Sequence, residues 1–461
     1  MIKKWFHRTG VILLMVLAYP SIAQQRFDIT VKDAVDIAFK NAADLKNAQL
    51  DHKITESRNK EVTALAYPQV SATLQGNHYL SLPLIQFPDA TENAVYRVLE
   101  REGYAVTGSP EFKVNNFSFF SPWNINLGAS LQQLLFEPQV FVGLQARKAL
   151  LESSGLQVKL TEDHVREAVH KNYYAVLIAE KQILFVRESL KRLQKLSADM
   201  EVMYKNGFVE RLDIDKTIVS VNNTRAVENQ LQNGIAIGYA ALKMSMGLLQ
   251  SDTLELKDTL TSEEIRKNLL EDFSYEDRNE IKILNKAKEL QQYDIKRHKL
   301  SYFPTVAAFY NFQQVGQRNS AAMQAGDQPW FWYNTNLVGL NIHVPIFDGG
   351  QKRQRIRQSQ FTLEKLENSL DKAKKGIDLE RTIAKNTLTH ALVNLSTQED
   401  NMRLAQRVFD TEKKKYEAGL GSSFAILQAD TELQQAQSNY FRSLYDAIVA
   451  RISYLKALGK L

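Results

Sequence analysis

The chain has 461 residues, of which 44% are hydrophobic and 24% charged, a composition that is ordinary for a folded protein. Its 58 Lys and Arg against 52 Asp and Glu leave a formal charge of +6, which is too small for a protein that binds nucleic acid by neutralising phosphates. The absence of Cys excludes a disulfide scaffold, a Cys-ligated zinc site and a thiol nucleophile.

The first residues have the pattern of an export signal. A basic start is followed by an apolar run at Val11–Ala18, and Ser21-Ile22-Ala23 fits the small-x-small rule of signal peptidase. We therefore predict that residues 1–23 form a signal peptide. The rest of the sequence has no apolar run of about 18 residues. The mature chain is expected to be periplasmic, secreted or inserted in a membrane through β-strands.

The remaining sequence contains two similar halves. Tyr67-Pro68-Gln69-Val70 resembles Phe303-Pro304-Thr305-Val306, and later Tyr204-Lys205-Asn206-Gly207 resembles Tyr416-Glu417-Ala418-Gly419. Because the matches follow the same order, duplication explains them better than coincidence. We predict one repeat over residues 24–270 and a second over 271–461. Each repeat is expected to contain a helix, two strands and two long helices.

The first element of each repeat is a helical stretch that ends before a proline. These stretches are predicted over Val31–Leu65 and Arg278–Leu300. Thr30 or Asp33 is a suitable N-cap for the first.

Four segments then alternate between apolar and polar residues, as amphipathic strands do. They are predicted over residues 69–79, 123–136, 304–314 and 335–347. Eight positions are expected on the apolar face, which would contact lipid: Ile125, Leu127, Ala129, Leu131, Val338, Leu340, Ile342 and Val344. A sheet on a soluble core shows the same alternation, but four such strands in an exported chain also fit an outer-membrane barrel.

Aromatic residues cluster where the second strand of each repeat begins. Trp123, Trp330 and Trp332 are interpreted as interface residues, because aromatic girdles mark the bilayer interfaces of membrane barrels. The segment Leu80–Asn116 is longer than its counterpart in the second half and contains several Gly and Pro. It is predicted to be a cell-surface loop, because the long loops of such barrels lie outside the cell.

Long helices with coiled-coil spacing follow in each half. They are predicted over residues 140–204, 210–248, 351–416 and 423–458. At ~1.5 Å per residue the first would extend roughly 90 Å, too long for a compact globule. A rod of this length suits a wide aqueous gap, although a structural coiled coil explains the spacing too.

These residues resemble the TolC-like family of outer-membrane efflux and secretion channels over nearly all of the mature chain. The resemblance rests on Ile29–Ala38, the two helix-to-strand joints at Tyr67-Pro68 and Phe303-Pro304, Pro345–Gly350 opening a helix, and the two Tyr-x-x-Gly turns. It implies a mainly α fold with a transmembrane β-barrel contribution. Four strands per chain would enter a 12-stranded barrel shared by a homotrimer and continued by an α-helical periplasmic tunnel. From the residues alone, four strands cannot close a barrel, and both three and four copies leave a lumen.

The resemblance also assigns roles at the turns between the long helices. It implies a periplasmic entrance that contacts an adaptor, the membrane fusion protein, which links the channel to an inner-membrane transporter. The candidate entrance residues are Tyr204, Gly207, Glu210, Asp213, Asp215, Tyr416 and Gly419. The family pattern often has acids where this second repeat has Ala425 and Gln428, which puts an acidic ring in doubt. An ordinary turn between helices with a solvated charge cluster explains the same residues.

No enzyme motif, metal-ligand spacing or nucleotide loop is found, so no catalytic residue, metal or cofactor is predicted. Three classes remain: a passive outer-membrane conduit of a tripartite efflux or type I secretion system, a periplasmic coiled-coil interaction protein that does not insert, and an exported enzyme with an unrecognised site. The first is favoured, in the outer membrane and extending into the periplasm. Neither the transported substrate nor the energy source of the inner-membrane partner follows from the sequence.

Overall fold

The computed structural model describes residues 26–88, 90–104, 114–118, 120–259, 265, 272–319 and 329–461. The predicted signal peptide, residues 1–23, lies outside this part of the chain.

The chain divides into two compact units, which we call the helical unit and the strand unit. The helical unit consists of Met1–Glu56, Lys148–Leu290 and Thr362–Leu461, and the strand unit of Ser57–Arg147 and Gln291–Phe361. Both units combine segments from both halves of the sequence, so the predicted repeat boundaries stay a prediction.

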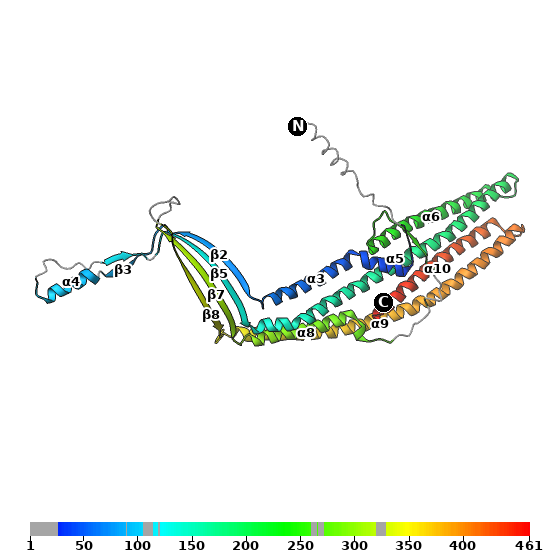
Figure 1. Ribbon diagram of the computed structural model, residues 1–461. Coiled ribbons are helices and arrows are strands. Elements are labelled where there is room, and N and C mark those ends of the chain that lie inside the picture. Colours follow the sequence, from blue (N-terminus) through cyan, green and yellow to red (C-terminus); the bar gives the residue numbers. More distant parts are fainter. Residues whose placement is uncertain are drawn as a thin grey trace, which may run out of the picture. The chain divides into compact units, whose positions relative to one another are not determined.

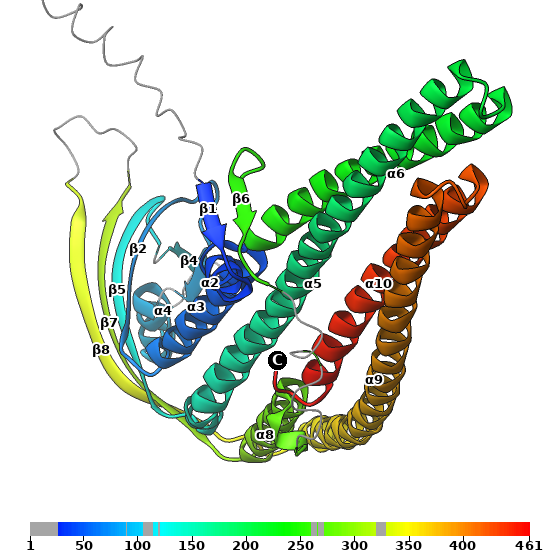
Figure 2. The ribbon, with the colours of Figure 1, turned by 90° about the vertical axis from the view of Figure 1, so that its right-hand side faces the viewer.

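Four long helices supply most of the helical unit: α5 (Pro138–Lys205), α6 (Arg211–Met246), α9 (Gln351–Glu417) and α10 (Ser423–Ala457). Their ends lie within two residues of the expected bounds. Figure 2 shows α5 running beside α6, and α9 beside α10, each pair joined by a short turn. Near the turns, side chains of all four helices form one buried cluster that includes Leu193, Met200, Ile214, Phe409 and Leu433. The coiled-coil spacing of α5 thus places Leu190, Leu193 and Met200 in this buried cluster.

The first predicted helix is divided in two, contrary to the expectation of one helix over Val31–Leu65. α2 (Val31–Asn41) is separated from α3 (Ala43–Ala64) by Ala42, whose backbone (φ −57°, ψ 125°) leaves the helical region. The predicted cap is confirmed, because the Thr30 hydroxyl accepts a hydrogen bond from the Asp33 amide and the Asp33 carboxylate accepts one from Thr30. The apolar side of α2 packs into a core shared with α5 and α6.

A small parallel pair of strands joins the two ends of the first half, and a short 3₁₀ helix begins the second half. β1 (Arg26–Ile29) pairs with β6 (Thr253–Leu256) in the helical unit. The 3₁₀ helix η1 (Tyr275–Asp277) precedes α8 (Asn279–Leu300), the counterpart of α3.

Arg278 links three helices near the C-terminus of the chain. It is 4% exposed and donates to both carboxylate oxygens of Glu280, to Glu380 of α9, and to the carbonyls of Lys456 and Ala457 at the end of α10. Burial alone raises the pKa of Glu280, but hydrogen bonds and charge from Arg278 hold it below its usual value. The guanidinium therefore satisfies two carboxylates and an otherwise open helix end.

The strand unit contains a four-stranded antiparallel sheet in the order β2-β5-β7-β8 (Figure 1). The strands are β2 (Gln69–His78), β5 (Trp123–Phe136), β7 (Thr305–Arg318) and β8 (Phe331–His343). β8 lies four residues earlier than predicted, and Val344 follows the strand instead of belonging to it. Pro345 has no N–H to donate, so pairing stops before it, while the aromatic residues at the start of β8 pair with the end of β7.

The predicted surface loop contains regular structure within its described part. β3 (Ile85–Pro88) pairs with β4 (Val114–Phe117), and α4 (Ala90–Arg101) lies between them in the chain. The predicted loop segment thus begins and ends in strands, where four residue pairs form an antiparallel ladder.

Candidate functional site

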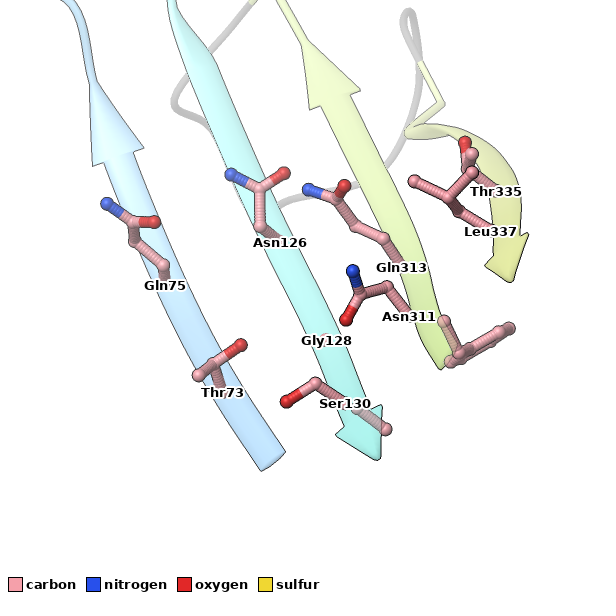
Figure 3. A pocket seen from close by; sticks show the side chains of 11 residues that line it. Thr73, Gln75, Asn126, Gly128, Ser130, Asn311, Gln313, Thr335 and Leu337 are labelled. Atoms are coloured by element: carbon pink, nitrogen blue, oxygen red, sulfur yellow. The ribbon is translucent and has the colours of Figure 1, made fainter. Parts of the chain in front are cut away.

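The two faces of the four-stranded sheet differ in chemistry. Residues directly opposite each other in an antiparallel ladder point to the same face. Thr73 therefore shares a face with Gly128, Gln313 and Thr335, which pair in succession across all four strands. Figure 3 shows these neighbours together with further amide and hydroxyl side chains around a hollow. We call this surface the polar face.

The opposite surface, the apolar face, carries seven of the eight residues predicted to contact lipid. Ladder partners place them together: Val70 pairs with Leu131, Leu131 with Tyr310, and Tyr310 with Val338. The seven are Ile125, Leu127, Ala129, Leu131, Val338, Leu340 and Ile342. Only Val344 falls outside the strands.

The apolar face is bare in the isolated chain. Val338 is 77% exposed, Leu74 74% and Val70 73%. Among the described residues, the sheet strands make their main contacts with each other and no helix covers them. A soluble protein normally covers the apolar face of an antiparallel sheet, because a large exposed apolar patch is an interaction surface. β2 and β8 also leave one edge each unpaired in the described sheet.

The predicted interface aromatics gather at one end of the sheet. Trp123 begins β5 and stacks on His78 with 4.0 Å between ring centroids. Trp332 lies against Gly316, where an added Cβ would come within 2.8 Å of the indole. Both belong to the apolar face, whereas Trp330 precedes β8 and lies 6.0 Å from the Trp332 ring. The arrangement is that of an aromatic rim at the end of an apolar band.

Both turns between the long helices end in a glycine with positive φ. Gly207 (φ +79°) donates to the Tyr204 carbonyl, and Gly419 (φ +74°) donates to the Tyr416 carbonyl. The following amide, that of Phe208 or Leu420, reaches back one residue further along its helix. This is the helix ending that favours glycine, because only glycine adopts a left-handed conformation without strain. The two sequence motifs therefore form equivalent turns.

The acidic residues after the first turn have local partners. The Asp213 carboxylate accepts a hydrogen bond from the Glu210 amide at 3.4 Å and so caps the start of α6. Asp215 forms an exposed ion pair with Arg211, with 3.1 Å between its Oδ1 and the arginine Nε. At the second turn Ser422 takes the capping role, because its hydroxyl accepts from the Ala425 amide. The acidic pair is thus confined to one of the two turns.

The two predicted tyrosines are not equivalent. The Tyr416 hydroxyl lies 3.4 Å from the sulfur of Met203 and 3.8 Å from that of Met200, both on α5. Its pKa is raised, first by burial and then by the nearby charges of Asp199 and Asp213. Tyr204, by contrast, is 44% exposed. Tyr416 therefore packs between helix pairs, whereas Tyr204 belongs to the surface of the tip.

A buried polar network near the turns was missed by the sequence analysis. Asp430 is 2% exposed and accepts hydrogen bonds from Ser189 at 2.6 Å, from Arg192 at 2.9 Å and from Gln434 at 2.7 Å. Gln434 also donates to Thr224 of α6 at 3.2 Å. The network connects α5, α6 and α10 and leaves the carboxylate paired, as a buried charge requires.

A signal for this network exists in the sequence. Asp430 stands three residues after Leu427 and three before Leu433, both buried, so it occupies the apolar stripe of α10.

The sequence analysis also missed the pair Phe208 and Leu420, which follow the two turn glycines and are 77% and 84% exposed. Large apolar residues at the same place in both halves indicate a surface that another molecule covers.

No helix in the described part of the chain is both long and apolar enough to cross a membrane.

Comparison with known proteins finds similar outer-membrane proteins. The family model described as "Outer membrane efflux protein" matches residues 277–460. The outer membrane protein TolC of Vibrio cholerae is 21% identical over 344 residues, which are 73% of this chain and 77% of that protein. The alkaline protease secretion protein AprF of Pseudomonas aeruginosa is 22% identical over 333 residues, 70% of this chain and 66% of that one. These matches confirm that the chain resembles the TolC-like family of outer-membrane channels.

Solved structures extend the likeness to the whole fold of this TolC-like channel. A crystal structure of CusC gives a TM-score of 0.71 at 17% identity and covers 94% of this chain and 92% of that one. The CmeC outer membrane channel of Campylobacter jejuni gives 0.69 at 14% identity, with 93% and 85% covered. The predicted fold class, helices with a β-barrel contribution, is confirmed. The protein is an outer-membrane channel that extends into the periplasm, and the relatives it matches are channel proteins.

Proposed function

We propose that this TolC-like channel is a homotrimeric, passive conduit with no catalytic activity of its own. The observation that carries the proposal is the sheet with a bare apolar face and two open edges. Lipid tolerates neither an open sheet edge nor an unpaired backbone group, so the sheet must be completed by other copies of the chain. Three copies of the four-stranded sheet supply a 12-stranded barrel, and the resemblance to TolC-like channels favours three copies over four. The apolar face then contacts lipid and the polar face lines the lumen.

The energy for transport is proposed to come from partners. The described residues contain no cluster of metal-binding side chains, and the sequence has no nucleotide-binding loop. A periplasmic adaptor and an inner-membrane transporter are therefore proposed to load the channel. The cargo class covers both small molecules and proteins, since relatives named for efflux, BepC of Brucella suis, and for protease secretion, AprF, both match.

The turns between the long helices are the proposed adaptor contact and entrance. Phe208 and Leu420 support this role, because they repeat at equivalent places and are exposed. Tyr204, Gly207 and Gly419 shape the same tips. We expect Phe208→Ser combined with Leu420→Ser to reduce export in cells while single-channel conductance stays at the wild-type level. Loss of conductance with unchanged adaptor binding would contradict the assignment.

Fractionation and bilayer recording test the proposal as a whole. The protein should be found in outer-membrane vesicles, migrate as a heat-modifiable oligomer, and produce discrete conductances in planar bilayers. A chain that stays in the soluble periplasmic fraction would support the alternative, a coiled-coil interaction protein that does not insert. An oligomer in the outer membrane without conductance, even in variants with a loosened tip, would contradict the channel function.

A further inference from the structure

The four sheet strands are nearly free of charge in a chain that is 24% charged. β2, β5 and β8 contain no Asp, Glu, Lys or Arg, and β7 contains one, Arg318, at its last position. Arg318 is the ladder partner of Trp123 and so lies on the apolar face, at the aromatic end. The polar face of the four strands therefore carries no fixed charge, and its one imidazole, His343, stands at the end of β8.

The polar face presents amides and hydroxyls in most rows, together with uncharged apolar side chains such as Val315 and Leu337. Successive ladder rows contain Gln75 with Asn126, Thr73 with Gln313, and Ser130 with Asn311. Figure 3 shows their side chains turned to one side of the sheet. Each carboxamide has both donors and acceptors, and each hydroxyl can act as either. The same side chains can therefore form hydrogen bonds with a cation, an anion or an uncharged polar solute, by reorienting a donor or an acceptor toward it.

A hollow interrupts this surface at Gly128. It has a volume of about 300 Å³ and is lined by residues of all four strands, among them Thr73, Asn126 and Gln313. A Cβ at Gly128 would come within 2.6 Å of the Thr73 hydroxyl oxygen. The glycine thus keeps the neutral groups accessible in the middle of the sheet.

Fixed charges on a low-dielectric wall set the ion preference of a pore, because they concentrate ions of opposite sign. We propose that the strand section of this channel is an uncharged, hydrogen-bonding passage that admits cationic, anionic and neutral polar solutes alike. This inference rests on the proposed function, in which the polar face lines the lumen.

The absence of Cys from the chain permits a direct test on the assembled channel. Gln313 belongs to the polar face as the ladder partner of Gly128, and Gln314 belongs to the apolar face as the partner of Leu127. Gln313→Cys and Gln314→Cys are adjacent, start from the same side chain and differ only in the face. Each variant is incorporated in a planar bilayer under a potassium chloride gradient. It is then treated with a cationic, an anionic or a neutral thiosulfonate, so the charge is added after folding.

For Gln313→Cys, the anionic reagent should shift the reversal potential toward that of potassium and the cationic reagent toward that of chloride. The neutral reagent should change conductance without moving the reversal potential. Gln314→Cys and the wild type should not respond to any reagent. The inference would be overturned, although the channel still conducts, if the two charged reagents shifted the reversal potential of Gln314→Cys in opposite directions. It would also be overturned if neither reagent shifted the reversal potential of Gln313→Cys. A shift of the same size with the neutral reagent would show that the bulk of the adduct and not its charge moves the reversal potential, and would also overturn the inference. Absence of current in every channel, wild type included, would instead count against the proposed function.

Discussion

A charge placed on either face of β8 tests the orientation of the sheet in the membrane. Val338 and Leu337 are adjacent aliphatic residues that are 77% and 53% exposed, so arginine at either position removes little packing. Val338 belongs to the apolar face as the partner of Tyr310, and Leu337 belongs to the polar face as the partner of Asn311. Val338→Arg and Leu337→Arg therefore differ only in whether the guanidinium meets lipid or water.

The expected cost follows from the depth of each residue. β8 has 13 residues, and Val338 stands next to its central residue, about 3 Å along the strand. A buried arginine near the midplane costs about 2–4 kcal/mol in each copy of the chain. Leu337→Arg should change stability by about 0.5 kcal/mol or less, as an exposed substitution does. Leu340→Arg lies about 8 Å from the midplane after allowance for strand tilt, and should cost about 1–2 kcal/mol.

The assay is the fraction of protein recovered as heat-modifiable oligomer in the outer membrane, together with the urea midpoint for unfolding from bilayers. We expect the order of loss Val338→Arg, then Leu340→Arg, then Leu337→Arg, with Asn341→Arg as mild as the last. Equal loss for Val338→Arg and Leu337→Arg would refute the assignment of the faces or the insertion of the sheet. A graded loss in the reverse order would place the polar face against lipid.

Further expectations concern the helical unit. Arg278→Met should lower the free energy of unfolding by about 3 kcal/mol in urea titration, because it leaves two carboxylates and a helix end unpaired. Arg278 lowers the pKa of Glu280, so the stability that Glu280 contributes is fully present above its unfolded pKa and is lost at lower pH. The difference in free energy of unfolding between Arg278→Met and the wild type should therefore shrink as the pH falls below about 4. Gly207→Ala should cost about 1–2 kcal/mol for the left-handed backbone alone, since its surroundings are open. Gly247→Ala should cost more, because its Cβ would also clash with the backbone carbonyl of Asn41, and thermal melts of the two variants measure the difference. Asp213→Asn with Asp215→Asn should reduce cation preference in bilayers if these carboxylates line the entrance, and an unchanged reversal potential would leave them their capping and pairing roles only.

Much of the local structure was determined by the sequence, because it depends on signals carried by neighbouring residues. Alternation placed seven of eight residues on the apolar face, and the absence of Pro together with the 3.5-residue seam gave the long helices ends within two residues. The Thr30 cap and the two Tyr-x-x-Gly turns depend on hydrogen bonds between residues a few positions apart, so both could be predicted from the sequence alone.

The tertiary structure decided what depends on partners distant in the sequence. The extent of β8 followed from pairing with β7 and not from its own alternation. The partners of Arg278 on α9 and α10 are likewise distant in the sequence, so its role in joining these helices is visible only in the folded chain. Asp430 stood in an apolar stripe, but its partners on α5 are more than 200 residues away. Most of all, an alternating strand is the same whether its apolar side meets a core or lipid. Only the sheet, bare on that side and open at both edges, distinguishes the two, because burial and edge pairing are properties of the assembled structure and not of the strand.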